Sequence, residues 1–264
     1  MRKRNAFFVS ALCVCLLSGC GNRSRSAENE PGVAGSDSIF RTPAGKADTF
    51  SVARPEPPKT AAPGPTARRL DSLGYVNVRT VDSSIRVRIV YATADNFTGK
   101  VLYDDLREAY LLPEVAEALV LAQRLLKTER PDLSLIVYDA ARPMSVQRRM
   151  KAAVRGTDQD IYVSNPENGG GLHNYGAAVD LSLADADGIP LPMGTPFDFL
   201  GPEAHITREE KLVSAGKITE AERQNRLLLR RVMKSAGFRP LSTEWWHFNY
   251  YSRTEARARL KVIE

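Results

Sequence analysis

The alternation of apolar and polar side chains predicts four strands after residue 70. In SIRVRIVYAT (84–93), Ile85, Val87 and Ile89 alternate with arginines, which is the period-two pattern of a half-buried strand. Three other segments carry the runs of aliphatic or aromatic residues that are typical of strands: LSLIVYDA (133–140), GAAVDLSL (176–183) and WHFNYY (246–251).

Helical spacing of apolar residues is clearest in PEVAEALVLAQRLLKTER (113–130), where Pro113 suits the first turn. The apolar face of this segment consists of Val115, Leu119, Ala122 and Leu126. A shorter helix is predicted at MSVQRRMKAAV (144–154).

Two further helix starts are indicated by capping boxes, in which Thr is followed three residues later by Glu, with glycines as predicted stops. The boxes are Thr207 with Glu210 and Thr219 with Glu222, and the stops are Gly216 and Gly237. Strands and helices together predict an α+β fold, a single domain with helices packed on a central, mostly antiparallel sheet.

The first twenty residues have the pattern of an export signal rather than of a folded element. Arg2, Lys3 and Arg4 precede an apolar stretch (6–17) that is too short to span a membrane as a helix. The stretch ends in Leu-Ser-Gly-Cys20, which resembles a bacterial lipobox, so we expect Cys20 to be lipidated and the mature protein to be anchored to the membrane in the cell envelope, on the periplasmic side. An ordinary secretory signal with an incidental cysteine is the alternative.

Residues 21–69 are rich in Ser, Ala, Pro and Gly and nearly lack large apolar side chains, which predicts a flexible tether. The segment 70–264 has the length of one globular domain. Removing the signal segment removes three basic residues and no acidic ones, so the formal net charge falls from +6 to +3. So mild a charge, without basic runs interleaved with aromatics, does not favour a nucleic-acid partner.

A histidine and an aspartate stand out in GGGLHNYGAAVDLSL (169–183). The glycines predict a loop, and in the strand that follows Asp180 shares a face with two small residues, Ala178 and Ser182. A buried carboxylate needs a cation, a set of hydrogen bonds or a metal, and His173 is near enough to fold back beside it.

A second polar group, Glu244 and His247, lies before and on the last predicted strand. The chain's three cysteines lie at or before residue 20, so a metal in the domain must be held by His, Asp or Glu. Two histidines and one aspartate would give zinc three ligands and leave a position for water, and Glu244 would be placed to take a proton from that water. Each residue has a structural alternative: His173 as a hydrogen-bonded loop residue, Asp180 in a salt bridge, Glu244 and His247 as a surface pair.

The joint pattern resembles the D-alanyl-D-alanine dipeptidases, the VanX-type branch of the zinc D,D-peptidases. His173, Gly176, Ala178 and Asp180 match HxxGxAxD, and Glu244-Trp-Trp-His247 matches ExWH. Other similar segments occur in order: YATADNFTGKVLY (91–103), YDAARPMSVQ (138–147), LPMGTPFDF (191–199) and EAH (203–205). The resemblance covers about residues 70–260.

The resemblance implies one zinc ion per chain held by His173, Asp180 and His247, with Glu244 as the catalytic base. It further implies that Arg142 stabilises the transition state and that Asp198 lies near the amino terminus of a small dipeptide substrate. His205 is expected to be structural or to support a ligand.

The sequence departs from the family at Gly171, where the resemblance leads us to expect a serine that contacts the substrate. The implied activity is hydrolysis of D-alanyl-D-alanine to two D-alanines in the cell envelope. The alternatives are a D,D-carboxypeptidase acting on peptidoglycan stem peptides and a non-catalytic peptidoglycan-binding lipoprotein. The sequence leaves the oligomeric state open.

Overall fold

A computed structural model describes residues 62–264. The predicted signal segment with Cys20, and the predicted tether up to residue 61, lie outside the described residues. Between residues 62 and 264, no helix is both long and apolar enough to cross a membrane.

The folded part begins earlier than the predicted boundary at residue 70. Helix α1 (Pro65–Ser72) starts inside the predicted tether, with proline in its first turn. Its Ala67 and Leu70 side chains are buried, and the backbone N–H and hydroxyl of Thr66 both donate to Asp105. Ala67 lies in the segment whose composition predicts a tether, so the burial of this helix is a tertiary feature that composition does not indicate.

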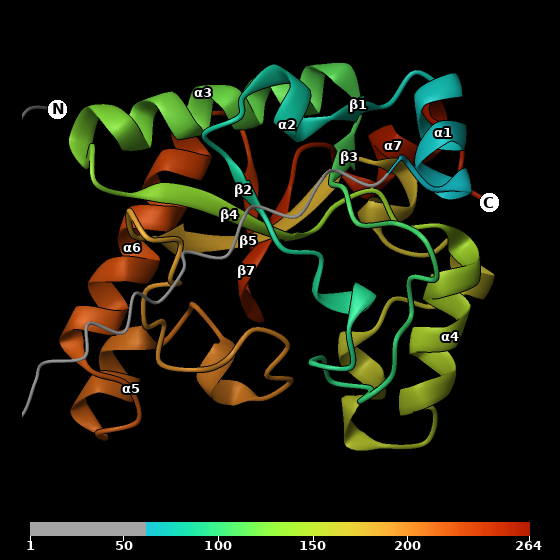
Figure 1. Ribbon diagram of the computed structural model, residues 1–264. Coiled ribbons are helices and arrows are strands. Elements are labelled where there is room, and N and C mark those ends of the chain that lie inside the picture. The colour runs from blue at the N-terminus through green and yellow to red at the C-terminus, as the bar shows by residue number, and fades with distance from the viewer. Residues whose placement is uncertain (1–61) are drawn as a thin grey trace, which may run out of the picture. The chain divides into compact units, whose positions relative to one another are not determined.

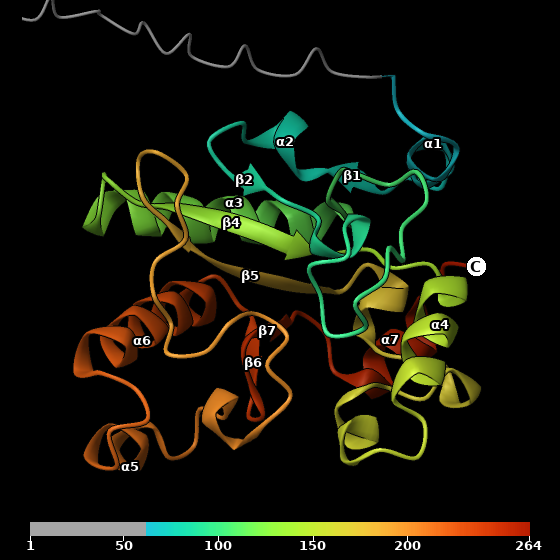
Figure 2. The same ribbon diagram turned by 60° about the horizontal axis from the view of Figure 1, so that its bottom comes forward.

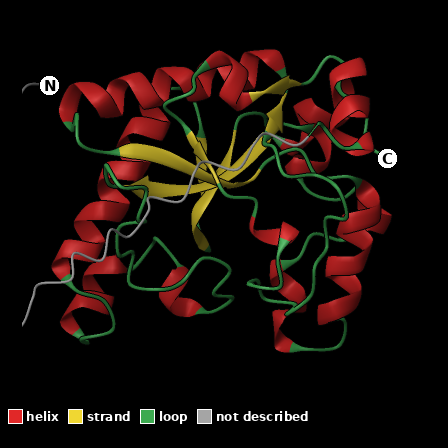
Figure 3. Cartoon of the chain, viewed as in Figure 1, coloured by secondary structure: helices red, strands yellow, loops and turns green. Residues whose placement is uncertain are grey.

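A five-stranded sheet forms the centre of the described part, with the strand order β2-β4-β5-β7-β6 (Figures 1 and 3). Neighbouring strands are antiparallel except for the pair β2 and β4, so the predicted mixed, mostly antiparallel fold is confirmed. The strands are β2 (Arg86–Val87), β4 (Ser134–Asp139), β5 (Ala178–Ala184), β6 (Arg239–Leu241) and β7 (Glu244–Asn249).

Helices α3 (Pro113–Glu129) and α6 (Glu220–Ser235) pack against each other and against this sheet (Figure 1). The four residues of the predicted apolar face of α3 are all buried, at 1% exposure or less. They join one core with the alternate residues Val179, Leu181 and Leu183 of β5. This face of β5 is therefore occupied by the core, and the intervening residues, among them Asp180, point to the opposite face.

The remaining elements surround this centre. Helix α4 (Met144–Val154) and helix α7 (Arg253–Arg259) lie on the side of the sheet away from α6 (Figure 2). A small antiparallel pair joins β1 (Val76–Asn77) to β3 (Tyr110–Leu111). The other short helices are α2 (Val78–Val81), α5 (Glu209–Ser214) and the 3₁₀ turns η1 (Val90–Ala92), η2 (Asp158–Tyr162), η3 (Pro166–Asn168), η4 (Leu172–Tyr175) and η5 (Pro202–Ala204).

Two predicted details are wrong. The strand predicted at 84–93 is reduced to two residues of β2, because the chain turns into η1, where Val90 and Tyr91 are both buried. The capping box at Thr207 is absent, since α5 begins after Arg208 with no side-chain cap. The box at Thr219, by contrast, is formed in full with Glu222.

Candidate active site

Strands β5 and β7 bring the first two candidate ligands together. Asp180 and His247 are direct cross-strand partners, and His247 Nδ1 lies 2.9 Å from Asp180 Oδ1. Asp180 lines a cavity, whereas its neighbours Ala178 and Ser182 on the same face of β5 are buried and do not line it. The register of the antiparallel pair β5 and β7 therefore sets the contact between Asp180 and His247.

The glycine loop brings the third ligand to the same point. Gly169 and Gly170 have left-handed backbone conformations (φ 73° and 65°), which glycine adopts without strain, and the chain then enters η4. His173, within η4, folds back over the sheet so that its Nε2 lies 3.3 Å from Asp180 Oδ2 and 3.2 Å from His247 Nδ1. The loop was correctly predicted, and His173 and Asp180 do meet.

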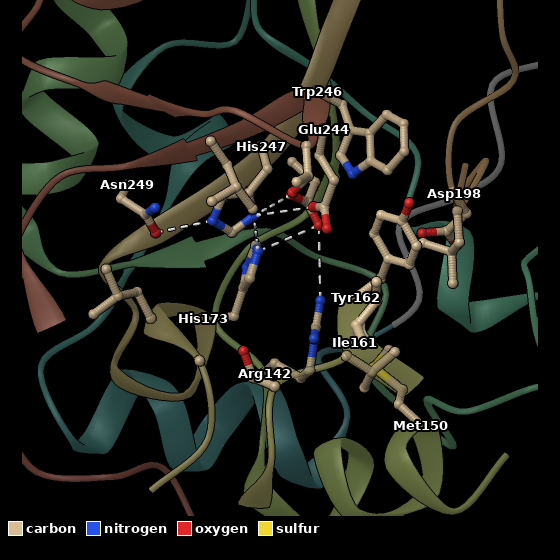
Figure 4. A pocket seen from close by; sticks show the side chains of 18 of the residues that line it. Arg142, Met150, Ile161, Tyr162, His173, Asp198, Glu244, Trp246, His247 and Asn249 are labelled. Carbon is tan, nitrogen blue, oxygen red and sulfur yellow. Dashed lines mark hydrogen bonds and ion pairs between the residues drawn. The ribbon is translucent and has the colours of Figure 1, made fainter. Parts of the chain in front are cut away.

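The hydrogen bonds on the outer sides of both rings show what this cluster is suited to hold. His247 Nε2 lies 2.9 Å from Asn249 Oδ1 (Figure 4), and His173 Nδ1 lies 2.8 Å from the Ala140 carbonyl oxygen. Both outer nitrogens therefore donate, and in neutral rings both inner nitrogens carry lone pairs. Two lone pairs and the Asp180 carboxylate then face one another within 4.8 Å, an arrangement that a divalent cation would satisfy.

Glu244 lies at the edge of this cluster, at the start of β7. Its Oε2 is 3.9 Å from His247 Nδ1, and the residue is only 9% exposed. Burial raises the pKa of the Glu244 carboxyl to about 7, against the attraction of His247. A carboxyl group that titrates near neutrality can both take up and release a proton.

Arg142 approaches the cluster from the end of the loop after β4. Its Nε and Nη2 donate to Asp139 Oδ2 at 2.9 and 2.6 Å, and its Nη1 donates to Gln147 Oε1 at 2.9 Å. The same Nη2 lies 3.7 Å from Asp180 Oδ2. Burial lowers the pKa of Arg142, but Asp139 and the other acidic groups around it together more than offset this and hold it well above the ordinary value, so the guanidinium keeps its charge.

Asp139 is the principal site residue that the sequence reading missed. It is 1% exposed, it ends β4 opposite Asp180 after a shift in register, and its Oδ1 accepts a hydrogen bond from Tyr103 at 2.7 Å. The signal was available, because Asp139 is a carboxylate at the end of a wholly buried strand, as unusual as Asp180. In the segment 138–147 a role was predicted for Arg142 alone, and none was predicted for Asp139.

Asp198 lies across the cavity from the histidines (Figure 4). Its φ of 63° is unusual for a residue other than glycine, and Tyr91 donates to its Oδ1 at 2.7 Å. Its Oδ2 is buried without a hydrogen-bond partner among residues 62–264, and burial raises the pKa of this carboxyl to about 7. Such a group is available to a cationic ligand.

All seven predicted residues of the domain site line one cavity of about 720 Å³: Arg142, Gly171, His173, Asp180, Asp198, Glu244 and His247. His205 does not take part in the His/Asp/His cluster and instead lies 3.2 Å from the hydroxyl of Tyr162, which also lines the cavity. Trp246, next to His247 on β7, is buried beside the cavity (Figure 4).

The family model described as D-ala-D-ala dipeptidase matches residues 71–263, and the chain belongs to this family. With its His/Asp/His cluster, the protein is a metallo-dipeptidase, so the predicted enzyme class is confirmed.

Among curated proteins, the D-alanyl-D-alanine dipeptidase of Escherichia coli (strain K12) is 31% identical over 178 residues, covering 67% of this chain and 85% of that protein. The D-alanyl-D-alanine dipeptidase of Enterococcus faecium is 30% identical over 192 residues, which is 67% of this chain and 91% of the relative. The protein of the same name from Enterococcus faecalis (strain ATCC 700802 / V583) is 30% identical over 190 residues.

Proposed function

We propose that this protein hydrolyses free D-alanyl-D-alanine to two molecules of D-alanine. The observation that carries the proposal is the convergence of His173, Asp180 and His247 with Glu244 and Arg142 on one cavity. The names of the relatives support D-alanyl-D-alanine as the substrate.

We infer that His173, Asp180 and His247 hold one zinc ion, because two imidazoles and one carboxylate are a frequent ligand set of catalytic zinc. Bound there, zinc supplies Lewis-acid polarisation of the scissile carbonyl and of water. Asn249 and the Ala140 carbonyl keep the two rings in the tautomers that present lone pairs inward.

Glu244 serves as general base and then as general acid. Its carboxylate takes a proton from the attacking water and delivers it to the nitrogen of the leaving D-alanine. The buried position that brings its pKa to about 7 suits both transfers.

Arg142 stabilises the negative charge that develops on the oxygen of the attacked carbonyl. The guanidinium is fixed by Asp139 and Gln147 before the substrate arrives, so little reorganisation is needed during the reaction. The three nitrogens of the Arg142 guanidinium form a planar fork and can all be oriented at once. A lysine lacks this fork of donors.

Asp198 binds the free ammonium group of the dipeptide. Its unpartnered Oδ2 points to this role, and an ammonium partner would favour the ionised carboxylate despite burial. A requirement for a free amino group favours cleavage of short peptides over cleavage of peptide bonds inside a long chain.

We further propose that the enzyme acts in the cell envelope, on the periplasmic side of the membrane, anchored through a lipid on Cys20 and with no nucleic-acid partner. Dipeptide met there comes from outside the cytoplasm, which favours wall turnover or recovery of D-alanine over glycopeptide resistance. If the anchor exists, mass spectrometry of the purified protein finds a lipid on Cys20, and Cys20→Ala abolishes this modification. An unmodified Cys20 would contradict the anchor.

The activity is tested by measuring release of D-alanine from D,D-, L,D- and L,L-dipeptides and from a stem pentapeptide, with and without chelator. We expect chelator-sensitive cleavage that is fastest with D-alanyl-D-alanine. Comparable cleavage of the pentapeptide would favour the D,D-carboxypeptidase alternative, and comparable cleavage of L,L-dipeptides would refute the stereochemical claim. A pure protein with neither metal nor cleavage would favour the non-catalytic alternative.

A further inference from the structure

Gly171 lines the cavity beside His173 without contributing a side chain. Its backbone is extended (φ −101°, ψ 179°), a conformation open to any residue, so the backbone does not require glycine here. A Cβ added to Gly171 would lie 3.0 Å from Ser164 Oγ and 3.4 Å from Ser164 Cβ. The space beside Gly171 is therefore taken by the side chain of Ser164.

Ser164 is tied to the oxyanion-stabilising arginine through one glutamine. Gln147 Nε2 donates to the Ser164 carbonyl oxygen at 2.8 Å, and Gln147 Oε1 accepts from Arg142 Nη1 at 2.9 Å. The backbone of Ser164 is thus fixed relative to the Arg142 guanidinium, although it lies in an irregular segment between η2 and η3.

The hydroxyl of Ser164 is free to bind a ligand. Ser164 lines the same cavity as His173 and Arg142, and its hydroxyl makes no hydrogen bond to any part of the chain between residues 62 and 264. Ser164 is only half-buried, so a bound peptide can reach its hydroxyl.

We propose that Ser164 is a specificity-determining residue whose hydroxyl hydrogen-bonds the backbone of the bound peptide. It supplies, from another position in the chain, the hydroxyl that Gly171 lacks. This inference rests on the proposed function, because the ligand is the dipeptide substrate of that reaction.

The test compares the wild type with Ser164→Ala, with the double variant Ser164→Ala/Gly171→Ser, and with Ser145→Ala. Ser145 is an exposed serine of α4 that does not line the cavity, which makes it the matched control. In the double variant the new Cβ at 171 meets only the Cβ of residue 164, at 3.4 Å, so the new Cβ has room. Steady-state release of D-alanine from D-alanyl-D-alanine gives kcat and KM, and thermal unfolding of each variant reports folding.

We expect Ser164→Ala to lower kcat/KM about 3- to 10-fold, mainly through KM, which corresponds to loss of one neutral hydrogen bond. The double variant should recover most of this loss, and Ser145→Ala should match the wild type. A merely structural role for Ser164 does not predict recovery by a hydroxyl at residue 171.

Two results would overturn the inference while the proposed function stands: kcat/KM of Ser164→Ala equal to that of Ser145→Ala, or a loss that Gly171→Ser does not repair. If the wild type itself releases no D-alanine, the proposed function fails, and the inference fails with it.

Discussion

Replacing Asp139 by Asn removes one buried charge while keeping the shape of the site. Both bonds from Arg142 end on Oδ2, so the amide oxygen of Asn can accept them, and the amide nitrogen can donate to the hydroxyl of Tyr103. The perturbation is therefore the loss of the charge that compensates Arg142, whose side chain is only 10% exposed.

The expected cost can be worked from these two bonds. Both bonds keep a charged donor but lose their charged acceptor; if each loses about half of the 1.5–3 kcal/mol that a hydrogen bond to a charged group contributes, the two together cost about 2 kcal/mol. Breaking a buried ion pair outright costs about 3–5 kcal/mol, which sets the upper limit. We therefore expect Asp139→Asn to lower the free energy of unfolding by about 2–4 kcal/mol.

Urea unfolding followed by the fluorescence of the buried Trp245 and Trp246 measures this cost. The matched control is Asp132→Asn. Asp132 also accepts from Nε and Nη2 of an arginine, Arg130, at 2.9 and 2.6 Å, but on the exposed surface. The control should leave the urea midpoint unchanged, because solvent screens an exposed pair. Equal midpoints for the two variants would refute the argument that burial makes the Asp139 pair important.

Three other changes test separate parts of the structure. Asn249→Leu removes the acceptor that fixes the His247 tautomer and should weaken zinc binding about 10- to 100-fold in a competition titration with a chelator; unchanged affinity would contradict the assigned tautomer. Glu244→Gln should keep one zinc per chain by elemental analysis while lowering kcat by at least about 100-fold; a variant with near-normal turnover would remove Glu244 from the role of base. Leu119→Ala, in the core face of α3, should lower the free energy of unfolding in urea by about 2–5 kcal/mol. Leu121→Ala on the same helix should lower it much less, because Leu121 is 45% exposed. Similar losses for the two variants would place the core elsewhere.

The sequence predicted the parts of the fold that depend on local pattern. The face of α3 that carries Leu119 and the alternation of β5 around Asp180 both follow from periodicity, and both match the structure. The Thr219 capping box also formed, because its two bonds are local to four residues.

The sequence could not predict features that arise from tertiary packing. The early end of β2 depends on burial of Val90 and Tyr91 together, which a two-residue period does not anticipate. The role of Asp139 depends on a register shift between β4 and β5 that places it opposite Asp180. The contact between Ser164 and Gly171 joins two loop residues whose approach no short-range pattern encodes.

The spacing of the proposed metal ligands along the chain bears on how the protein would acquire a metal. His173 and His247 are 74 positions apart, and the residues between them include α5 and α6. Asp180 and His247 become neighbours only when β5 and β7 pair, and the His173 ring is oriented by the Ala140 carbonyl. The ligand set is thus assembled by backbone pairing and core burial, unlike small zinc domains whose local ligands fold around the ion. We therefore expect the chain to complete its fold without the metal and to bind the ion afterwards.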